Sequence, residues 1–211
     1  MAAARLNAVT GVFSYTGRAI AEELLARGEA VRSLSRRDAP DDRLRARVEV
    51  APLFDEQSLA GAHTLYNTYW IRFECGGSTF ERAAENTIAL FRAAERAGVG
   101  RIVHVSVSNP ERARDLPYFA GKLRIEEWLA ASEIPHAIVR PTLVFGPEDI
   151  LVNNIAWILR RLPAPEDRLN MLFSATLSQR VLELAYEHMN DPELVRIEPD
   201  KVTVDKVRQV V

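Results

Sequence analysis

The sequence predicts an α/β fold in which a doubly wound parallel sheet carries helices on both faces, extended by a C-terminal β-α-β segment. Two observations predict it. Apolar runs of strand length alternate with segments of helical period along the chain. A glycine-bearing turn, Thr10 to Gly17, joins the first apolar run to the first helical segment. Repeated β-α-β units follow from this alternation, and their strands are parallel.

The elements of the first part of the chain are bounded by glycine, proline and polar residues. We expect strands at Leu6–Thr10, Ala30–Ser35, Val48–Ala51, Thr64–Tyr69, Arg101–Ser106 and His136–Arg140. We expect helices at about Gly17–Arg27, Phe80–Gly98 and about Tyr118–Ser132. Gly28 ends the first helix and Pro141 ends the sixth strand. Ile102, Val103 and Val105 are all apolar, which is typical of a strand buried on both faces.

Beyond Pro147 the pattern changes. Residues 150–161 indicate a helix, and 162–167 form a polar connector broken by two prolines. A strand (170–174), a helix (178–190) and a strand (194–198) complete the chain. We therefore divide the protein into a domain of residues 1–156 and a C-terminal segment of residues 157–211.

Composition limits the function. With 47% hydrophobic residues and a net charge of −2, we expect a folded core and no duplex-binding surface. Cys75 is the single cysteine and the four histidines are scattered, so we expect neither a disulfide nor a metal site. The N-terminus leads directly into the first strand, and no apolar run approaches the roughly 20 residues that span a bilayer. We expect a cytoplasmic protein with no membrane or nucleic-acid partner.

The turn between the first strand and the first helix predicts a dinucleotide site. Gly11 permits the tight turn, and Gly17 permits close packing of helix on strand. The free amides at the start of the helix then face a pyrophosphate. Ser14 stands where the middle glycine of such a motif would be. The predicted cofactor-binding residues of this turn are Gly11, Phe13, Ser14, Tyr15, Thr16 and Gly17.

The end of the second strand favours NADP over NAD. NAD-binding proteins usually place an acidic residue there to hold the ribose 2′-hydroxyl. This chain has Arg36 and Arg37 instead, and an arginine pairs well with a 2′-phosphate. The alternative is that these arginines are solvated surface side chains without a role in binding, in which case NAD is also a possible cofactor.

Tyr118 and Lys122 lie four residues apart at the start of the predicted helix that follows the fifth strand. This spacing puts the phenol and the ammonium on one helical face. A nearby cation, together with the positive nicotinamide ring, would lower the pKa of the tyrosine and suit it to proton transfer.

Residues 1 to about 156 resemble the atypical or extended short-chain dehydrogenase/reductase group, including its NmrA-like and epimerase-like members. The resemblance is carried by Thr10-Gly11-x-x-Ser14-x-x-Gly17, Asn86, His104-Val105-Ser106, Tyr118-x-x-x-Lys122, Arg140-Pro141-Thr142 and Gly146-Pro147. It implies that Tyr118 is the acid/base, that Lys122 holds the nicotinamide ribose, and that Pro141 and Thr142 lie beside the carboxamide. It also makes a homodimer plausible.

The sequence departs from this group in two places. Val107 occupies the position where the group often has its catalytic hydroxyl, which leaves Ser106 as our candidate. The acid usual after the third strand is displaced to Asp55, which we count among the cofactor-binding residues together with Thr68.

Residues from about 157 onward resemble a different family, the DEAD-box RNA helicases, at the end of their first RecA-like domain. Ser174-Ala175-Thr176 matches the Ser-Ala-Thr motif of that family. The chain has no G-x-x-x-x-G-K-[ST] phosphate loop and no Asp-Glu-Ala-Asp, so we expect no helicase activity. The whole resembles a chimera; divergence of a dehydrogenase tail is the alternative.

Three functions follow from these patterns. The first is an NADP-dependent oxidoreductase or epimerase-type enzyme that uses Tyr118 and Lys122 on an unidentified small molecule. The second is a dinucleotide-binding module without turnover, such as a redox sensor or accessory subunit. The third is RNA binding through arginines of the C-terminal segment, which neighbouring acidic residues oppose.

Overall fold

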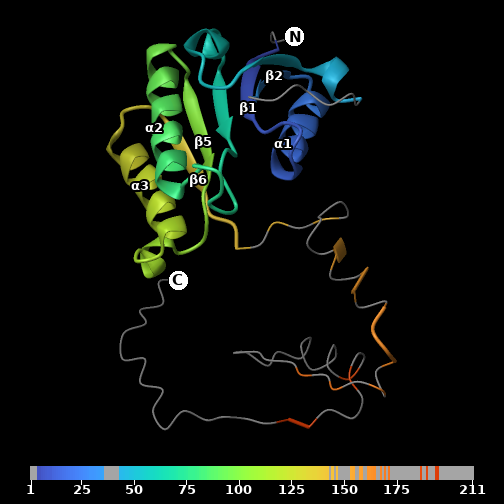
Figure 1. Ribbon diagram of the computed structural model, residues 1–211. Helices are drawn as coiled ribbons and strands as arrows, with labels where there is room; N and C mark the ends of the chain where they lie inside the picture. The colour runs from blue at the N-terminus through green and yellow to red at the C-terminus, as the bar shows by residue number, and fades with distance from the viewer. Residues whose placement is uncertain are drawn as a thin grey trace, which may run out of the picture. The chain divides into compact units, whose positions relative to one another are not determined.

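The computed structural model describes residues 4–35 and 43–142, and isolated short stretches between 144 and 194. The chain divides into two compact units, Met1–Ile150 and Leu151–Val211. The first unit contains every named strand and helix, and its sheet and helices are shown in Figure 1.

The first unit is built on a six-stranded sheet in the order β3-β2-β1-β4-β5-β6, with every neighbouring pair parallel. The strands are β1 (Leu6–Thr10), β2 (Ala30–Ser35), β3 (Glu49–Pro52), β4 (Thr64–Asn67), β5 (Arg101–Val105) and β6 (His136–Val139). The chain order reverses between β1 and β4. In open parallel sheets, the carboxyl ends of the strands at such a reversal form the ligand-binding crevice.

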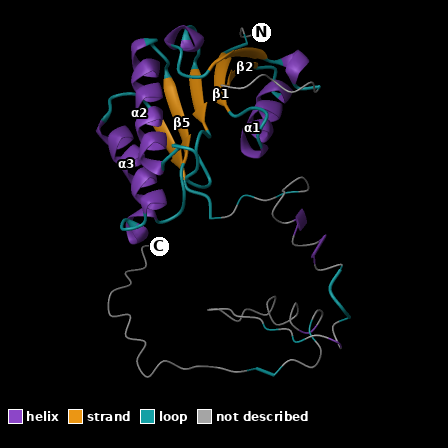
Figure 2. Ribbon diagram, in the orientation of Figure 1, coloured by secondary structure: helices purple, strands orange, loops and turns teal. Residues whose placement is uncertain are grey.

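Helices cover both faces of the sheet, as Figure 2 shows. The helices are α1 (Tyr15–Ala26), α2 (Phe80–Arg96) and α3 (Pro117–Ala131), with the short 3₁₀ turns η1 (Arg45–Arg47), η2 (Glu56–Leu59) and η3 (Pro110–Ala113). The larger core cluster joins α2 and α3 to one sheet face; its fully buried members include Ala8, Leu65, Phe91, Ile102, Ile125 and Leu129. The smaller cluster joins α1 to the other face through Val9, Val31, Ala21 and Leu24. The doubly wound α/β fold is confirmed.

The six strands and three helices predicted for this unit are all present, and the differences at their ends have local causes. α1 begins at Tyr15 rather than Gly17, because Ser14 has an extended backbone and serves as the N-cap residue. β4 ends at Asn67, because the amide of Thr68 donates to the Thr10 hydroxyl (2.7 Å) rather than continuing the strand ladder.

The expectation that β5 is buried on both faces was wrong. Ile102 and His104 are fully buried under α2 and α3, but Val103 and Val105 on the opposite face are only half-buried. α1 packs over β1 and β2, and within the described part of the chain no helix covers this face at β5 and β6. Val139, which pairs with Val105, is accordingly 48% exposed.

Most predictions for the C-terminal unit fall outside the described residues. Of the helix expected at 150–161, residues 153–154, 157–158 and 161 are described; the first four are helical, and Arg161 lies in a turn. The guanidinium of Arg161 lies 3.7 Å from the centre of the Trp157 ring. The segments expected at 170–174, 178–190 and 194–198 lie almost wholly outside the described residues.

Two features are absent from the described residues. These residues contain no helix with the length and apolar character needed to cross a membrane. They also contain no group of three His, Cys, Asp or Glu side chains that could hold a metal ion.

Candidate dinucleotide site

The turn between β1 and α1 has the shape that a pyrophosphate requires. Gly11 has a φ of +67°, in the left-handed region that favours glycine. A Cβ on Gly17 would lie 2.1 Å from the carbonyl oxygen of Gly11 and 2.9 Å from that of Thr10, so only glycine lets α1 approach the turn this closely. The amide of Ser14 donates to the Gly11 carbonyl (2.8 Å), and the Ser14 side chain makes no capping bond. The first amides of α1 have no partner inside the helix and point toward this turn.

Thr68 fixes the turn to the end of β4. Its hydroxyl donates to the Thr10 carbonyl (2.6 Å), and its amide donates to the Thr10 hydroxyl (2.7 Å). A Cβ on Gly11 would lie 3.0 Å from the Thr68 hydroxyl. The structure therefore brings the predicted residues Gly11 and Thr68 together at the point where the strand order reverses.

A buried polar network continues from this turn to β5. The Asn67 side chain accepts from the Thr10 hydroxyl (3.3 Å) and from the Tyr69 amide (3.3 Å) through its oxygen. Its nitrogen lies 3.0 Å from Nδ1 of His104, whose ring packs edge-on against Phe91. Burial, with a smaller contribution from Lys122, lowers the pKa of His104 to about 3. His104 is therefore a neutral core residue.

Lys122 is buried beside the end of β5. Its ammonium donates to the Val105 carbonyl (2.9 Å) and lies 4.5 Å from the centre of the Trp70 ring. Burial lowers the pKa of Lys122 to about 7, against an opposing contribution from Glu126. Ser106 directly follows Val105 in the chain and is buried. Within the described residues, its hydroxyl has no hydrogen-bond partner. The structure thus places two of the three predicted catalytic residues next to each other.

Tyr118 lies one helical turn before Lys122 in α3, as the spacing predicts. Its ring packs edge-on against Trp70, Phe80 and Phe119, with ring centres 5.7, 5.4 and 5.2 Å away. In the protein alone, burial raises the pKa of Tyr118, and the lowering expected beside a bound nicotinamide ring stays a prediction. The aromatic rings remove water from the phenol.

Pro141 and Thr142 follow β6 and lie beside the end of β5. The Ser106 amide donates to the Val139 carbonyl (2.8 Å), and the Ser108 amide donates to the Pro141 carbonyl (3.0 Å). The segment predicted to contact the carboxamide is therefore held next to the Ser106–Lys122 pair. Thr142 is exposed and Pro141 half-buried, so both are accessible to a ligand.

The start of α1 carries three more of the predicted cofactor-binding residues: Phe13, Tyr15 and Thr16. Phe13 packs against the smaller core cluster. The Tyr15 hydroxyl lies close to Gly146: a Cβ added to Gly146 would be 2.2 Å from the hydroxyl oxygen. Tyr15 and Thr16 also line an open cavity of about 750 Å³ that runs along α1, together with Ala19, Ile20, Leu24, Tyr66 and Val144. Their side chains thus line the flank of α1, whereas their amides lie in its first turn.

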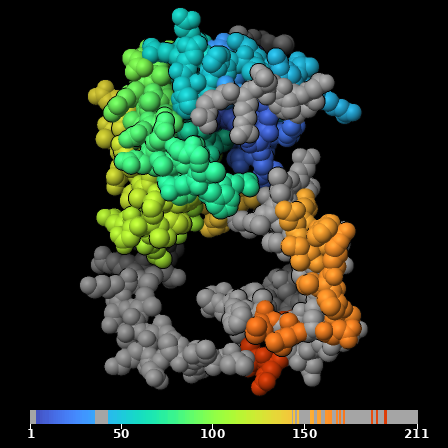
Figure 3. Space-filling view, viewed as in Figure 1, coloured from blue at the N-terminus to red at the C-terminus, as the bar shows by residue number. Residues whose placement is uncertain are grey.

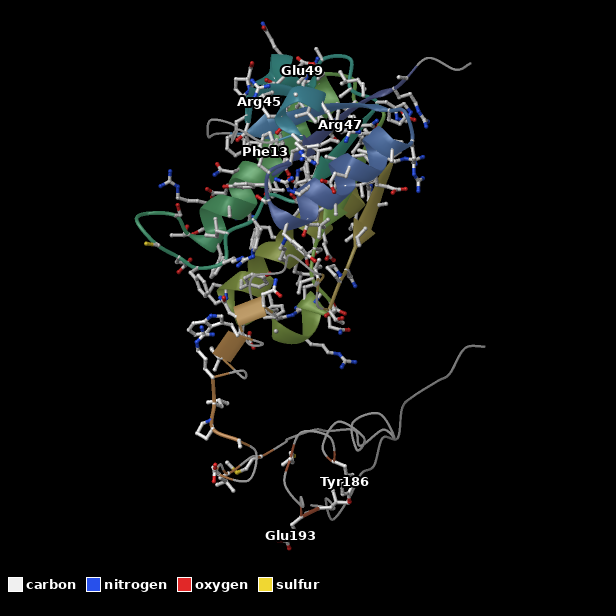
Figure 4. All side chains as sticks on the ribbon, turned by 90° about the vertical axis from the view of Figure 1, so that its right-hand side faces the viewer. Phe13, Arg45, Arg47, Glu49, Tyr186 and Glu193 are labelled. Atoms are coloured by element: carbon white, nitrogen blue, oxygen red, sulfur yellow. The ribbon has the colours of Figure 1, made fainter. Side chains whose placement is uncertain are left out.

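Arg36 and Arg37, the predicted 2′-phosphate ligands, lie outside the described residues. Arg45 and Arg47, in η1, precede β3 and therefore lie at the amino ends of the strands. Figure 4 shows Arg45 and Arg47 in the same upper part of the first unit as Phe13.

Two further residues singled out in the sequence are engaged within the protein. Asp55 is exposed and is the N-cap residue of η2, where its carboxylate accepts from the Gln57 amide (3.2 Å) and the Ser58 hydroxyl (3.3 Å). Asn86 donates to the Tyr69 hydroxyl (3.3 Å).

Sequence reasoning missed the role of Gly121. A Cβ at Gly121 would lie 2.8 Å from the tip of the Trp70 ring and 3.3 Å from the Phe80 carbonyl. This glycine therefore lets α3 pack closely against Trp70. Trp70 belongs to the segment 68–79, which connects β4 to α2. That segment lies at the surface beside α2, teal-green next to green in Figure 3. A glycine inside a helix, between Tyr118 and Lys122, was the signal that could have found it.

The fold and the glycine turn define a Rossmann-type dinucleotide-binding protein. A family model described as NAD(P)H-binding matches residues 12–149 of the chain. The chain belongs to this NAD(P)H-binding family.

Solved structures with this fold include short-chain dehydrogenases and reductases. A short-chain dehydrogenase/reductase superfamily protein from Agrobacterium tumefaciens with bound NAD matches with a TM-score of 0.52 and 23% identity, over 64% of this chain and 48% of that one. Citrobacter sp. triphenylmethane reductase complexed with NADP(H) matches with a TM-score of 0.53 and 22% identity, over 65% and 49%. At such identities the likeness concerns the fold, and this chain spans about half the length of each. The predicted resemblance is confirmed by family and by fold.

The second resemblance is confirmed as a partial one. The ATP-dependent RNA helicase RhlB from Aeromonas salmonicida is 57% identical to this chain over 58 residues, which are 28% of this chain and 14% of the helicase. The chain therefore spans a small part of that relative, and the match extends to a segment of about the predicted size.

Proposed function

We propose that the chain is an NADP-dependent oxidoreductase or epimerase-type enzyme in which Tyr118 transfers the proton and Lys122 holds the nicotinamide ribose. One observation carries the proposal: Lys122, one helical turn after Tyr118, donates to the Val105 carbonyl at the end of β5, next to Ser106 and at the same sheet edge as the Gly11–Gly17 turn. Carboxyl ends of parallel strands share one edge of the sheet, so a dinucleotide on the turn reaches this point.

The residues present fit such a cofactor. A Cβ at Gly17 would collide with the Gly11 carbonyl, so this glycine keeps the turn in the shape that a pyrophosphate requires, and the Ser106 hydroxyl is a buried polar group with no partner among the described residues. The nicotinamide, when bound, supplies or accepts a hydride. Gly11 to Gly17 would hold the pyrophosphate, Lys122 the ribose, and Pro141 and Thr142 the carboxamide.

The raised pKa of Tyr118 favours one direction of proton transfer. Because burial raises this pKa, the phenol is protonated at neutral pH. It therefore serves as a general acid that gives its proton to a substrate oxygen during reduction. The Lys122 ammonium can donate hydrogen bonds to the hydroxyl groups of a ribose that lies beside it.

The preference for NADP over NAD rests on Arg36 and Arg37. A guanidinium binds a phosphate with two parallel hydrogen bonds, and no acidic residue stands at the end of β2 to hold a free 2′-hydroxyl.

The experiment is an NADPH-oxidation assay on a panel of ketones, aldehydes, quinones and triphenylmethane dyes. Tyr118→Phe is expected to reduce kcat by at least about 100-fold with little change in NADPH affinity. Tyr66→Phe, which removes a phenol from the other sheet face, is the matched control and should leave kcat unchanged. Full activity of Tyr118→Phe would refute the assigned role.

A binding module without turnover is the second candidate. One observation favours it: Val107 stands in place of the usual catalytic hydroxyl. Tight NADPH binding without turnover of any substrate on the panel would favour this candidate. Helicase activity is not proposed, because the chain lacks the phosphate loop and the Asp-Glu-Ala-Asp motif.

A further inference from the structure

Glu126 is a charged residue in the interior of the domain. It lies in α3 with only 3% of its surface exposed. Both of its oxygens accept from Nε of Arg140, at 3.2 and 3.0 Å, and one of them also contacts Nη2 of the same guanidinium. A buried carboxylate is tolerated when it is paired in this way, and the planar guanidinium fixes the geometry of the pair.

Arg140 connects this pair to the ligand-binding edge. It follows directly after β6 and precedes Pro141, and its side chain is 46% exposed. The carboxylate of Glu111, in η3, lies 3.8 Å from Nη1 of Arg140. Three elements (α3, β6 and η3) therefore meet at one guanidinium, immediately before the segment assigned to the carboxamide.

Glu126 also acts on Lys122, one helical turn earlier. Both side chains are buried on the inner face of α3. The negative charge of Glu126 raises the pKa of Lys122 against the larger opposite effect of burial. The other titratable groups around Lys122 are His104 on β5, which is neutral, and Tyr118 on α3; Arg140 lies beyond Glu126.

We propose that Glu126 is a positioning residue for the cofactor site: through Arg140 it holds the Pro141–Thr142 segment, and by its charge it keeps Lys122 protonated for the ribose. This inference rests on the proposed function, since it assigns Glu126 to the same site. Neither Glu126 nor Arg140 is a catalytic residue, because both act through their neighbours.

The proposal predicts how NADPH binding depends on pH. With the pKa of Lys122 near 7, the ammonium is lost as the pH rises from 6 to 8, and NADPH affinity should fall over this range. Removing the charge of Glu126 lowers the pKa of Lys122, so the same fall should occur at lower pH. At pH 7, Glu126→Gln should therefore bind NADPH about three- to tenfold more weakly than the unaltered chain.

The experiment titrates the full chain with NADPH at pH 6, 7 and 8, following nicotinamide fluorescence. The matched control is Glu127→Gln, the same chemical change on the next, exposed residue, and it should leave the profile unchanged. Glu126→Asp keeps the charge and should restore the midpoint on the pH axis. An unshifted midpoint for Glu126→Gln, or an equal shift for Glu127→Gln, would overturn the proposal.

A second measurement separates this inference from the proposed function. The pH dependence of unfolding of the cofactor-free protein reports on Lys122 directly, because stability rises with pH above the folded pKa of about 7 and up to the unfolded value of 10.5. In Glu126→Gln this rise should begin at lower pH. If the unaltered chain bound no NADPH, the proposed function would fail, while the unfolding curves would still decide whether Glu126 holds the charge of Lys122. A rise that begins at the same pH in both proteins would refute that coupling.

Discussion

The buried, neutral His104 makes a quantitative prediction about acid stability. In the folded protein, the Asn67 nitrogen donates to Nδ1 of His104, because the Asn67 oxygen is occupied by the Thr10 hydroxyl and the Tyr69 amide. Protonation of Nδ1 would place two donors face to face. Burial is the main cause of a pKa of about 3 instead of 6.5, and the charge of Lys122 adds a smaller contribution in the same direction.

The sign of the effect follows from this lowered pKa. Below pH 6.5 the unfolded chain takes up a proton at His104 that the folded chain does not, so stability falls as the pH falls, until the folded pKa near 3. At about 1.4 kcal/mol per pH unit, acidification from pH 7.5 to 4.5 removes roughly 2 to 3 kcal/mol of the free energy of unfolding. This is a large fraction of the stability of a domain, typically about 5–15 kcal/mol.

The assay is urea unfolding of the full chain at pH 7.5, 6.5, 5.5 and 4.5, followed by circular dichroism. His104→Gln, whose side chain can still accept from Asn67, is the comparison variant. Carboxylates titrate in both proteins, so the difference between the two pH profiles isolates His104. The variant should lose roughly 2 to 3 kcal/mol less than the unaltered chain over this range. Parallel profiles would show that His104 is not a buried neutral residue, and would refute the reasoning.

Three other substitutions test the geometry of the site. Gly17→Ala would place a methyl group 2.1 Å from the Gly11 carbonyl, so NADPH binding should be lost in a fluorescence titration. Gly28→Ala is the control, because a Cβ at Gly28 meets no atom within 4 Å. The control should lose about 1–2 kcal/mol of stability in thermal unfolding because of the positive φ of Gly28, and it should still bind NADPH. Gly121→Ala pushes α3 away from Trp70, and we expect a loss of about 1–3 kcal/mol in urea unfolding, together with weaker NADPH binding; an unchanged unfolding midpoint would contradict the close packing. Thr68→Val removes the donor to the Thr10 carbonyl and should cost about 1 kcal/mol in the same assay; a neutral outcome would mean that this hydroxyl does not hold the turn.

Much of the fold could be predicted because its signals are local. β1 and β2 match their predicted bounds, and Gly11 and Gly17 behave as a strand–turn–helix motif requires. The face of a strand that stays half-buried could not be predicted, since Val103 and Val105 look as apolar as Ile102. Their exposure depends on which helices cover the sheet, which is a property of the whole domain.

The candidate site divides in the same way. The four-residue spacing was enough to place Tyr118 and Lys122 on one face of α3. It could not show that Trp70 and Phe80, from distant segments, desolvate the phenol and raise its pKa. The pairing of Glu126 with Arg140 joins residues from α3 and the end of β6, and no spacing rule links them.

The most direct test of the account is a pair of titrations of the purified full chain, with NADPH and with NADH, each repeated on Gly17→Ala and on Arg36→Ala. We predict saturable NADPH binding that is tighter than NADH binding, is abolished by Gly17→Ala and is weakened by Arg36→Ala. Binding of neither nucleotide, or binding that survives Gly17→Ala unchanged, would contradict the claim that the turn after β1 is a dinucleotide site.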